Sequence, residues 1–263
     1  MIHPFLRNMK LFLFDLDGVI WRGQELIPGA HHVLKTLVEH NKLIVYVTNN
    51  STKTKEQYIA KMKAFGIQAT TEQIYTSAYA TAEVLQRLGK KTAYVVGGDG
   101  IRDALRRAGI EVRSSASVNR PDAVVVGMDV NFTYAILRTA MRAILGGAEF
   151  IGTNPDTSFP AEDGISPGAG TMIAAIATGV GFAPKIVVGK PNPEMLLQAM
   201  KKFDVPSDKS VIIGDRLSTD IASGIKANIS TVRVMTGVQD HSESIVPDLQ
   251  IESIRELLVS KQT

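Results

Sequence analysis

The sequence of 263 residues contains no cysteine, which excludes disulfide bonds, thiolate catalysis and zinc sites built on thiolates. This absence fits a reducing compartment. No apolar run reaches the roughly 20 residues that a membrane-spanning helix requires. The first residues do not form a signal peptide, because the apolar stretch at residues 12–19 is too short and too acidic. We therefore expect a cytoplasmic protein that has no membrane partner.

The chain also carries little net charge. Its 29 Lys and Arg residues and 26 Asp and Glu residues leave a net charge of only +3. The basic residues are dispersed along the chain, so no nucleic-acid partner is expected. No Pro/Gly/Ser-rich linker, internal repeat or low-complexity segment is present. The length suggests one or two domains with a substantial core.

Two aspartates stand at the end of the apolar run at residues 11–14, which has the composition of a strand buried on both faces. Asp15 and Asp17 leave such a strand on the same side, and Gly18 allows a sharp turn after them. Paired carboxylates next to apolar residues favour a divalent metal site with a carboxylate nucleophile. A solvated loop with helix-capping aspartates is the alternative interpretation.

Short apolar runs alternate with longer amphipathic segments through the whole chain, which is typical of βαβ units. Expected strands are residues 11–14, 43–47, 92–96, 123–127, 150–152, 185–188, 211–214 and 231–234. Expected helices include residues 30–40, 53–65, 101–108, 133–145, 193–203 and 219–227. Glycines at 66, 109, 147 and 181 stand where helices should end. Gly97-Gly98-Asp99-Gly100 fits neither dinucleotide nor Walker patterns and predicts a tight βα turn.

Four of the expected strands end in polar side chains. These are, in chain order, Asp15 and Asp17; Thr48, Asn49, Asn50 and Ser51; Lys190; and Asp215 with Asp220. If the four strands are parallel in one sheet, the groups meet at one edge. Carboxylates for Mg²⁺, a hydroxyl with amides, and a lysine together suit a phosphate ester.

Each group also has a simpler explanation when it is taken alone. Lys190 could be solvated, and the segment beginning at Thr48 could cap the helix near residue 53. Gly214-Asp215 could form a tight turn, and Asp220 could be an acid in the first turn of the next helix. The conjunction of all four in this order favours the functional interpretation.

These motifs resemble the haloacid dehalogenase-like superfamily, through Asp15-Leu-Asp17-Gly-Val, Thr48-Asn49, Lys190 and Gly214-Asp215-Arg216-Leu-Ser-Thr-Asp220. The finer resemblance is to the NagD-like, p-nitrophenylphosphatase-like branch. It rests on segments beginning at Trp21, Thr48, Thr153, Pro167 and Gly189. The resemblance implies an α/β fold with a Rossmann-like parallel-sheet core at residues 1–80 and 184–263, and an inserted α/β cap at residues 81–183.

The resemblance also implies a mechanism, in which a small-molecule phosphate ester is hydrolysed with Mg²⁺. Asp15 would be the nucleophile that forms an aspartyl-phosphate, and Asp17 would be the general acid and then the base. The metal would be bound by Asp15, the backbone carbonyl of Asp17, and Asp215. Thr48, Asn49 and Asn50 would bind phosphate oxygens, and Lys190 would offset the negative charge.

In the cap, the resemblance places Phe159 near a substrate-contacting position, although ordinary packing is an equal alternative. Thr153-Asn154-Pro155-Asp156 could be a hinge or a substrate-facing turn. A phosphotransferase or mutase using the same aspartyl-phosphate is the nearest rival function. A non-catalytic sensor of phosphorylated ligands is the rival from another class. A homodimer is one option for the oligomeric state.

Overall fold

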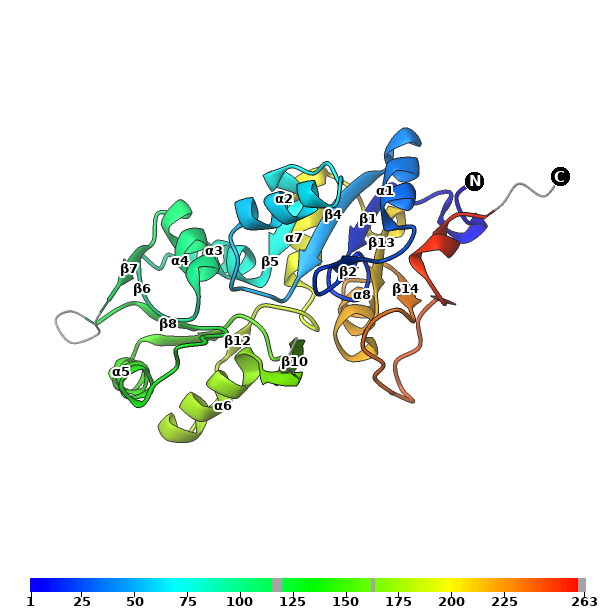
Figure 1. Ribbon diagram of the computed structural model, residues 1–263. Helices are drawn as coiled ribbons and strands as arrows, with labels where there is room; N and C mark the ends of the chain where they lie inside the picture. Colours follow the sequence, from blue (N-terminus) through cyan, green and yellow to red (C-terminus); the bar gives the residue numbers. More distant parts are fainter. Residues whose placement is uncertain (115–119, 162–163, 260–263) are drawn as a thin grey trace. The chain divides into compact units, whose positions relative to one another are not determined.

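The computed structural model describes residues 1–114, 120–161 and 164–259, and the chain forms two compact units (Figure 1). The first unit consists of Met1–Thr48, Tyr58–Tyr75 and Lys190–Thr263, and the second of Asn49–Gln57 and Thr76–Gly189. Each unit contains its own parallel sheet, so the predicted fold class is confirmed. The boundaries of catalytic core and cap after residues 80 and 183 stay a prediction about function.

The first unit is built on a six-stranded sheet with the strand order β15-β14-β13-β1-β4-β5. The strands are β1 (Leu11–Phe14), β4 (Leu43–Thr48), β5 (Ile74–Thr76), β13 (Ser210–Gly214), β14 (Ser230–Val234) and β15 (Leu249–Ile251). The pairs from β15 through to β4 are parallel. β1 is therefore flanked by β13 and β4, so that the polar ends of these three strands lie at the same edge.

Both faces of this sheet are covered, which explains the continuous apolar runs of its strands. Phe12 and Phe14 of β1 belong to the core cluster that contains Val33 and Leu37 of α1 (Ala30–Glu39). Leu11 and Leu13 belong to the opposite cluster, with residues of α7 (Glu194–Phe203). Because successive side chains alternate between the faces, all four residues of β1 are fully buried. The position of Asp15 is thus fixed by a strand without a solvent-facing side.

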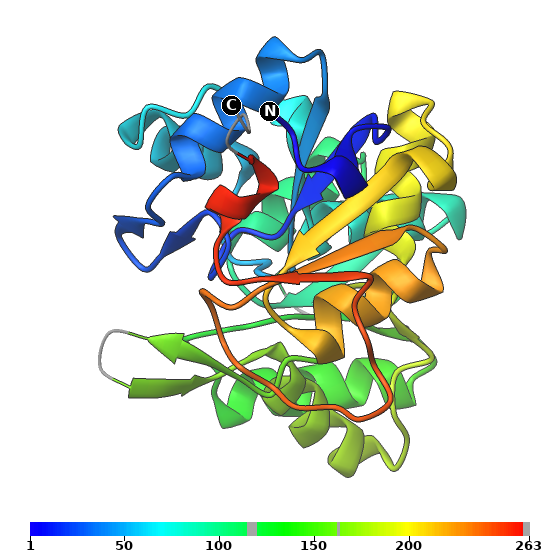
Figure 2. The ribbon, with the colours of Figure 1, turned by 90° about the vertical axis from the view of Figure 1, so that its right-hand side faces the viewer.

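Further helical segments complete the first unit. They are α2 (Lys55–Ala64), which begins in the second unit, α8 (Ala222–Lys226), a π-helical turn (Leu217–Ile221), and 3-10 turns at Pro4–Leu6, Thr71–Gln73, Ser207–Lys209 and Ile254–Leu257. β2 (Trp21–Arg22) and β3 (Glu25–Leu26) form a small hairpin. The N-terminal segment lies beside the C-terminal one, where Ile2 pairs with Leu258 (Figure 2).

The second unit contains a five-stranded sheet with the order β12-β9-β8-β6-β7, in which all four strand pairs are parallel. Its elements are β6 (Thr92–Val96), β7 (Glu111–Arg113), β8 (Ala123–Val126), β9 (Glu149–Gly152), β12 (Ile186–Val187), α3 (Ser77–Arg87), α4 (Asp99–Arg107), α5 (Tyr134–Leu145) and α6 (Ala169–Val180). One face is packed against α5 and α6. β10 (Ser158–Ala161) and β11 (Gly164–Pro167) form an antiparallel hairpin.

One expectation about the sheets is wrong, because the run before Lys190 does not join the catalytic sheet. β12 pairs with β9 in the second unit, and only Lys190 itself returns the chain to the first unit. The apolar pattern of a short strand gives no information about which sheet it joins, and both residues of β12 are only half-buried. Three strand ends and one connecting residue, rather than four strand ends, therefore supply the polar groups.

The predicted helix ends are confirmed at all four glycines, which adopt positive φ angles between +71° and +97°. In the part of the chain that the structure describes, no helix is long and apolar enough to span a bilayer.

Candidate active site

The carboxyl ends of the three central strands bring three predicted residues to one edge of the sheet. Asp15 follows β1, Thr48 is the last residue of β4, and Asp215 follows β13. The Asp15 amide still donates to the carbonyl of Ile213, at 2.9 Å, so the ladder holds its backbone. Asp15 and Asp215 are both buried, with 8% and 2% of their surface exposed, respectively. Such burial is costly for carboxylates unless positive charge compensates them.

Lys190 provides one such charge, although it is 175 residues away from Asp15 in sequence. Its Nζ atom lies 2.5 Å from Asp15 Oδ1 and 2.6 Å from Asp220 Oδ1, and it also donates to the Val47 carbonyl at 3.4 Å. Burial disfavours the ammonium form, but the two carboxylates outweigh this effect and raise the pKa of Lys190. The lysine is therefore a permanent cation that links two carboxylates.

One lysine does not neutralise three acids. Carboxylate oxygens of Asp15, Asp215 and Asp220 all lie within 4.8 Å of one another. Burial, together with repulsion from Asp220 and Asp215, raises the pKa of Asp15 well above its usual value, against the attraction of Lys190. Burial and the charge of Asp220 likewise raise the pKa of Asp215 to about 7. The excess negative charge creates a demand for a further cation.

The donor set fits Mg²⁺, because every group is an oxygen ligand and no His or Cys is present in it. Asp220 is the least available of the three. Its Oδ1 accepts from Lys190 and its Oδ2 from the Arg216 amide at 3.1 Å. Asp15 and Asp215 are thus better placed than Asp220 to offer an oxygen to a metal, and their role as metal ligands stays a prediction.

Asp17 is in a different environment from Asp15. It is exposed, and its carboxylate does not belong to the acidic group within the described residues. Its Oδ1 accepts a hydrogen bond of 2.9 Å from the indole Nε1 of Trp21, which is fully buried. Lys61 lies over the indole ring at 4.2 Å. This geometry leaves the second carboxyl oxygen of Asp17 for other chemistry.

Thr48 ends a buried strand, and its side chain shares a hydrogen bond with the hydroxyl of Tyr58. Burial, followed by the charge of Asp17, raises the pKa of Tyr58, so this phenol stays neutral and able to donate. The hydroxyl of Thr48 is therefore oriented from the side of α2. Tyr58 is a residue that sequence reasoning missed, because a lone tyrosine in an amphipathic helix is indistinguishable from a packing residue.

Asn49 and Asn50 belong to the second unit. The Asn49 carbonyl accepts from Ser77 Oγ at 2.6 Å and from Asn154 Nδ2 at 2.8 Å. Asn50 Oδ1 accepts from the amide and the hydroxyl of Thr52, at 3.0 and 2.7 Å, which is a local turn before α2. The cap of α2 is instead Thr54, whose Oγ1 accepts from the Gln57 amide at 3.3 Å, so the capping interpretation describes neither Thr48 nor Asn50.

Phe159 lies in β10, opposite Ser166 of β11, and is half-buried. In the preceding turn, the Asp156 carboxylate accepts from Asn49 Nδ2 at 3.1 Å, and the Asp156 amide donates to Asn154 Oδ1 at 3.2 Å. The segment Thr153-Asn154-Pro155-Asp156 is thus tied to the residue that follows Thr48. The substrate contact of Phe159 remains a prediction.

Sequence reasoning also missed Trp21, Arg233 and Asp240 as parts of the site's surroundings. Trp21 contributed to the family resemblance, and its place four residues after Asp17 was the only signal of a contact. Arg233 is buried at 6% exposure in β14, and its ion pair with Asp240 could not be read from a sequence in which the two stand seven residues apart.

Comparison with known families agrees with this geometry. Residues 12–111 match a haloacid dehalogenase-like hydrolase model, and residues 187–257 match a HAD-hydrolase-like model. An acid sugar phosphatase of Staphylococcus haemolyticus is 39% identical over 93% of this chain and 92% of its own. A dihydroxyacetone phosphatase of Corynebacterium glutamicum is 40% identical over 88% and 83%, respectively.

Solved structures give the same result. A 4-nitrophenylphosphatase from Thermotoga maritima has a TM-score of 0.90 and 32% identity, with 97% of this chain and 98% of that chain covered. NagD from E. coli K-12 has a TM-score of 0.86 and 32% identity, with 94% and 98% covered. A glycerol phosphate phosphatase from Mycobacterium tuberculosis, solved in complex with magnesium, has a TM-score of 0.90 and 29% identity, with 98% and 78% covered.

The identity along almost the whole chain, with the acidic edge of the parallel sheet, places the protein among the phosphatases of the haloacid dehalogenase-like hydrolases, in the branch of NagD and the p-nitrophenylphosphatases.

Proposed function

We propose that the protein is a Mg²⁺-dependent phosphatase that hydrolyses small sugar or polyol phosphate monoesters through an aspartyl-phosphate at Asp15. The observation that carries this proposal is the Asp15 carboxylate, buried at the end of β1, which is held by Lys190 beside two further carboxylates. The substrate class is supported by the names of the relatives, an acid sugar phosphatase and a dihydroxyacetone phosphatase.

Asp15 acts as the nucleophile. Its carboxylate oxygen attacks phosphorus, an acyl-phosphate bond forms, and the bond to the ester oxygen breaks. The ion pair with Lys190 fixes the rotamer of Asp15, and backbone pairing to Ile213 fixes its position. Preorganisation of this kind lowers the barrier because the reacting atoms are held close to their productive geometry.

Asp17 moves the proton. It gives a proton to the ester oxygen as that oxygen leaves, and it then takes a proton from the water that attacks the acyl phosphate. Asp15 and inorganic phosphate are released in the second step. Two features support this role, namely the exposure of Asp17 and the hydrogen bond from Trp21, which holds one carboxyl oxygen and leaves the other available.

Asp15, Asp215 and the backbone carbonyl of Asp17 would hold the metal. Bound Mg²⁺ supplies positive charge that screens the phosphate oxygens from the carboxylate nucleophile. Asp220 orients Lys190 and the Arg216 amide through its two oxygens. Thr48, Asn49 and Asn50, together with the amides of this segment, bind phosphate oxygens, and Lys190 offsets the charge that gathers around them.

Residues 1–80 and 184–263 carry the chemistry in this proposal, and the cap at 81–183 sets substrate choice, with Phe159 as the selecting residue. Phe159→Ala should change the ranking of phosphate esters by kcat/KM and leave the Mg²⁺ dependence unchanged. If Phe159 only packs, the variant melts at a lower temperature and keeps the substrate ranking.

The deciding experiment is release of inorganic phosphate from a panel of phosphate monoesters, measured with and without Mg²⁺. Hydrolysis of sugar and triose phosphates that is abolished by chelation is expected. Phosphate appearing on an added alcohol or sugar acceptor, rather than in solution, would establish the phosphotransferase instead. Tight binding without turnover for every ester would establish the sensor.

A further inference from the structure

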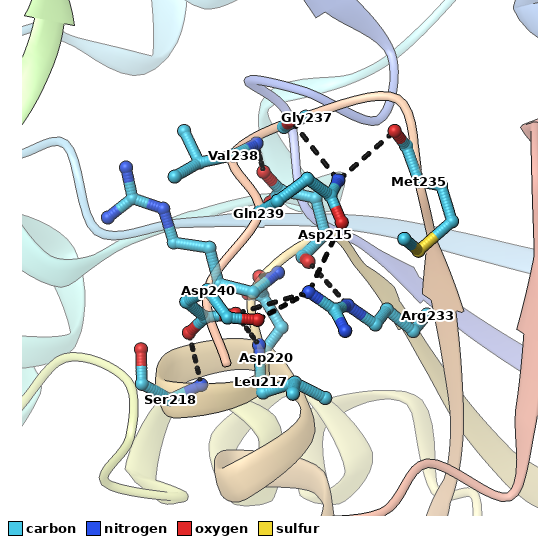
Figure 3. A network of polar contacts seen from close by, with 11 residues as sticks. Asp215, Leu217, Ser218, Asp220, Arg233, Met235, Gly237, Val238, Gln239 and Asp240 are labelled. Atoms are coloured by element: carbon cyan, nitrogen blue, oxygen red, sulfur yellow. Dashed lines mark hydrogen bonds and ion pairs between the residues drawn. The ribbon is translucent and has the colours of Figure 1, made fainter. Parts of the chain in front are cut away.

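The segment that follows β14 lies directly against the carboxylate of Asp215. The Val238 amide donates to Asp215 Oδ2 at 2.5 Å. A Cβ atom on Gly237 would lie 1.9 Å from the same oxygen, so only a glycine allows the backbone to approach this closely. The residues from Met235 to Asp240, which we name the 235–240 segment, therefore form one wall around a proposed metal ligand (Figure 3).

A buried arginine holds the far end of this segment, whereas its near end is held by Thr236, whose Oγ1 donates to the Gly18 carbonyl at 2.6 Å. Arg233 Nη2 donates to the Asp240 carbonyl at 2.8 Å and to Gln239 Oε1 at 3.3 Å, and it lies 3.4 Å from Asp240 Oδ1. Its Nε donates to the Asp215 carbonyl at 3.2 Å. One guanidinium thus connects the backbone of Asp215 to the far end of the segment that contacts the Asp215 side chain. A lysine, with a single nitrogen, cannot reach these groups in a fixed planar arrangement.

Asp240 extends the connection to the second acidic strand end. Its two carboxylate oxygens accept from the amides of Leu217 and Ser218, both at 2.8 Å. These amides open the π-helical turn Leu217–Ile221, which carries Asp220. Both sides of the acidic group, at Asp215 and at Asp220, are therefore tied to the same ion pair.

We propose that Arg233 and Asp240 are positioning residues for the metal: their ion pair clamps the 235–240 segment so that the Val238 amide and Gly237 fix the Asp215 carboxylate in its ligating orientation. The proposal rests on the proposed function, because it assumes that Asp215 binds Mg²⁺. Neither residue of the pair belongs to the acidic group of Asp15, Asp215 and Asp220 found among the described residues. Outer residues that orient metal ligands typically change metal affinity by 10–100-fold when they are replaced.

The test is Mg²⁺ binding to the intact protein, measured by isothermal titration calorimetry and by the Mg²⁺-dependent rise in Tm. Arg233→Met, which removes the guanidinium but keeps the apolar stem, should weaken Mg²⁺ binding by about tenfold. Arg233→Lys should recover only part of this loss, and Asp240→Asn should weaken binding severalfold. The Mg²⁺ concentration for half-maximal hydrolysis of p-nitrophenyl phosphate should rise in parallel, with a smaller change in the substrate KM.

The double variant tests whether the two residues act together, because substitutions that break the same contact do not have additive effects. Arg233→Met with Asp240→Asn should bind Mg²⁺ about as weakly as Arg233→Met alone. Arg255→Met is the matched control, because Arg255 donates to the Pro28 carbonyl at 3.1 Å in the same unit and makes no described contact with the acidic group in residues 1–114, 120–161 and 164–259. The affinity of the Arg255→Met variant for Mg²⁺ should equal that of the wild type.

A purely structural role predicts a lower Tm with unchanged Mg²⁺ affinity, and that result in any folded variant of the pair would overturn the proposal. If Arg233→Met does not fold, Mg²⁺ binding to Asp240→Asn and Arg233→Lys tests the proposal instead. Wild-type protein that fails to bind Mg²⁺ would overturn the proposed function and the clamp together. Wild-type binding with unaffected variants would remove the clamp alone.

Discussion

In both parallel sheets, a threonine and an aspartate join neighbouring strands by reciprocal hydrogen bonds. In the second unit, the Asp122 carboxylate accepts from the amide of Thr92, and the Asp122 amide donates to Thr92 Oγ1. In the first unit, Asp248 and Thr231 repeat this arrangement. The amino ends of the two sheets are thus fixed by the same local chemistry.

The carboxyl ends of the two sheets differ. In the described part of the second unit, Asp129 is the only buried acid, and its oxygens accept from the amides of Gly97 and Asn131, at 3.1 and 2.9 Å. In the first unit, Asp15, Asp215 and Asp220 gather around Lys190. The amides compensate the buried carboxylate of Asp129, whereas the three clustered carboxylates need protons or a further cation besides Lys190. The comparison shows that parallel sheets with similar amino ends can carry very different charge at their carboxyl ends.

The largest effect is expected from exchanging one buried aspartate in each sheet. Asp15→Asn should lower kcat by at least about a thousandfold, which corresponds to roughly 4 kcal/mol, because the amide is not a nucleophile. Asp129→Asn, the matched control, should keep kcat within a fewfold of wild type and change only Tm. Comparable losses of kcat in both variants would break the distinction between the two edges.

The second-largest effect is expected from removal of the buried cation, Lys190. Lys190→Met leaves Asp15 and Asp220 without their counter-charge, and it should reduce the free energy of unfolding by about 3–5 kcal/mol and abolish most turnover. Lys202→Met, which breaks the surface pair with Glu72, should cost less than about 1 kcal/mol. Urea denaturation of both variants measures the difference. Equal small losses would mean that the buried network contributes little.

The proton-transfer assignment should show as a dependence on the leaving group. Asp17→Asn should lose about 100-fold in kcat with a sugar phosphate but much less with p-nitrophenyl phosphate, whose phenolate leaves without protonation. Trp21→Phe, which removes the indole donor to Asp17 and shrinks a buried ring, should show the same trend at a smaller amplitude, together with a lower Tm. Equal losses for both substrates in Asp17→Asn would contradict general-acid catalysis.

The smallest effect concerns the feature that the two sheets share. Asp122→Ala and Asp248→Ala should each reduce stability by about 1 kcal/mol at neutral pH without affecting kcat. Hydrogen bonds from the Lys91 and Thr92 amides lower the pKa of Asp122, against the effect of its slight burial. Its contribution is therefore complete above the unfolded pKa of about 3.9 and disappears as the pH falls through the lower folded value. Thermal unfolding between pH 3 and pH 7 should show the wild-type advantage over Asp122→Ala shrinking at acidic pH.

Much of this fold could be predicted from the sequence, because strands buried on both faces leave continuous apolar runs. Residues 11–14 and 92–96 were predicted with the boundaries that the structure has. The first-turn aspartate interpretation of Asp220 was insufficient, since its carboxylate binds Lys190 as well as a backbone amide. No residue range was predicted for α3 or α6, although the helix end at Gly181 was predicted; α6 is largely apolar and lacks charged residues to mark its faces.

What could not be predicted was long-range pairing. The sheet that β12 joins, the contact of Tyr58 with Thr48, and the clamp of Arg233 depend on which segments meet in space. The periodic pattern of apolar residues along the sequence does not predict such long-range contacts. Asp15 and Asp215 could be brought together from the sequence because strand ends converge by a general rule of parallel sheets, whereas Lys190 lies on a connecting segment and the supporting residues follow no such rule.

The tight packing around Asp215 also limits how this protein can evolve. A Cβ atom on Gly18 would lie 2.7 Å from Asp215 Oδ2, and one on Gly237 would lie 1.9 Å from it. The residues that are allowed at positions 18, 215 and 237 therefore depend on one another, although these positions are far apart in sequence. Any side chain at 18 or 237 collides with the acid that is present at 215. Single substitutions at these positions should therefore be selected against. Descendants of this enzyme should change all three residues together or none of them.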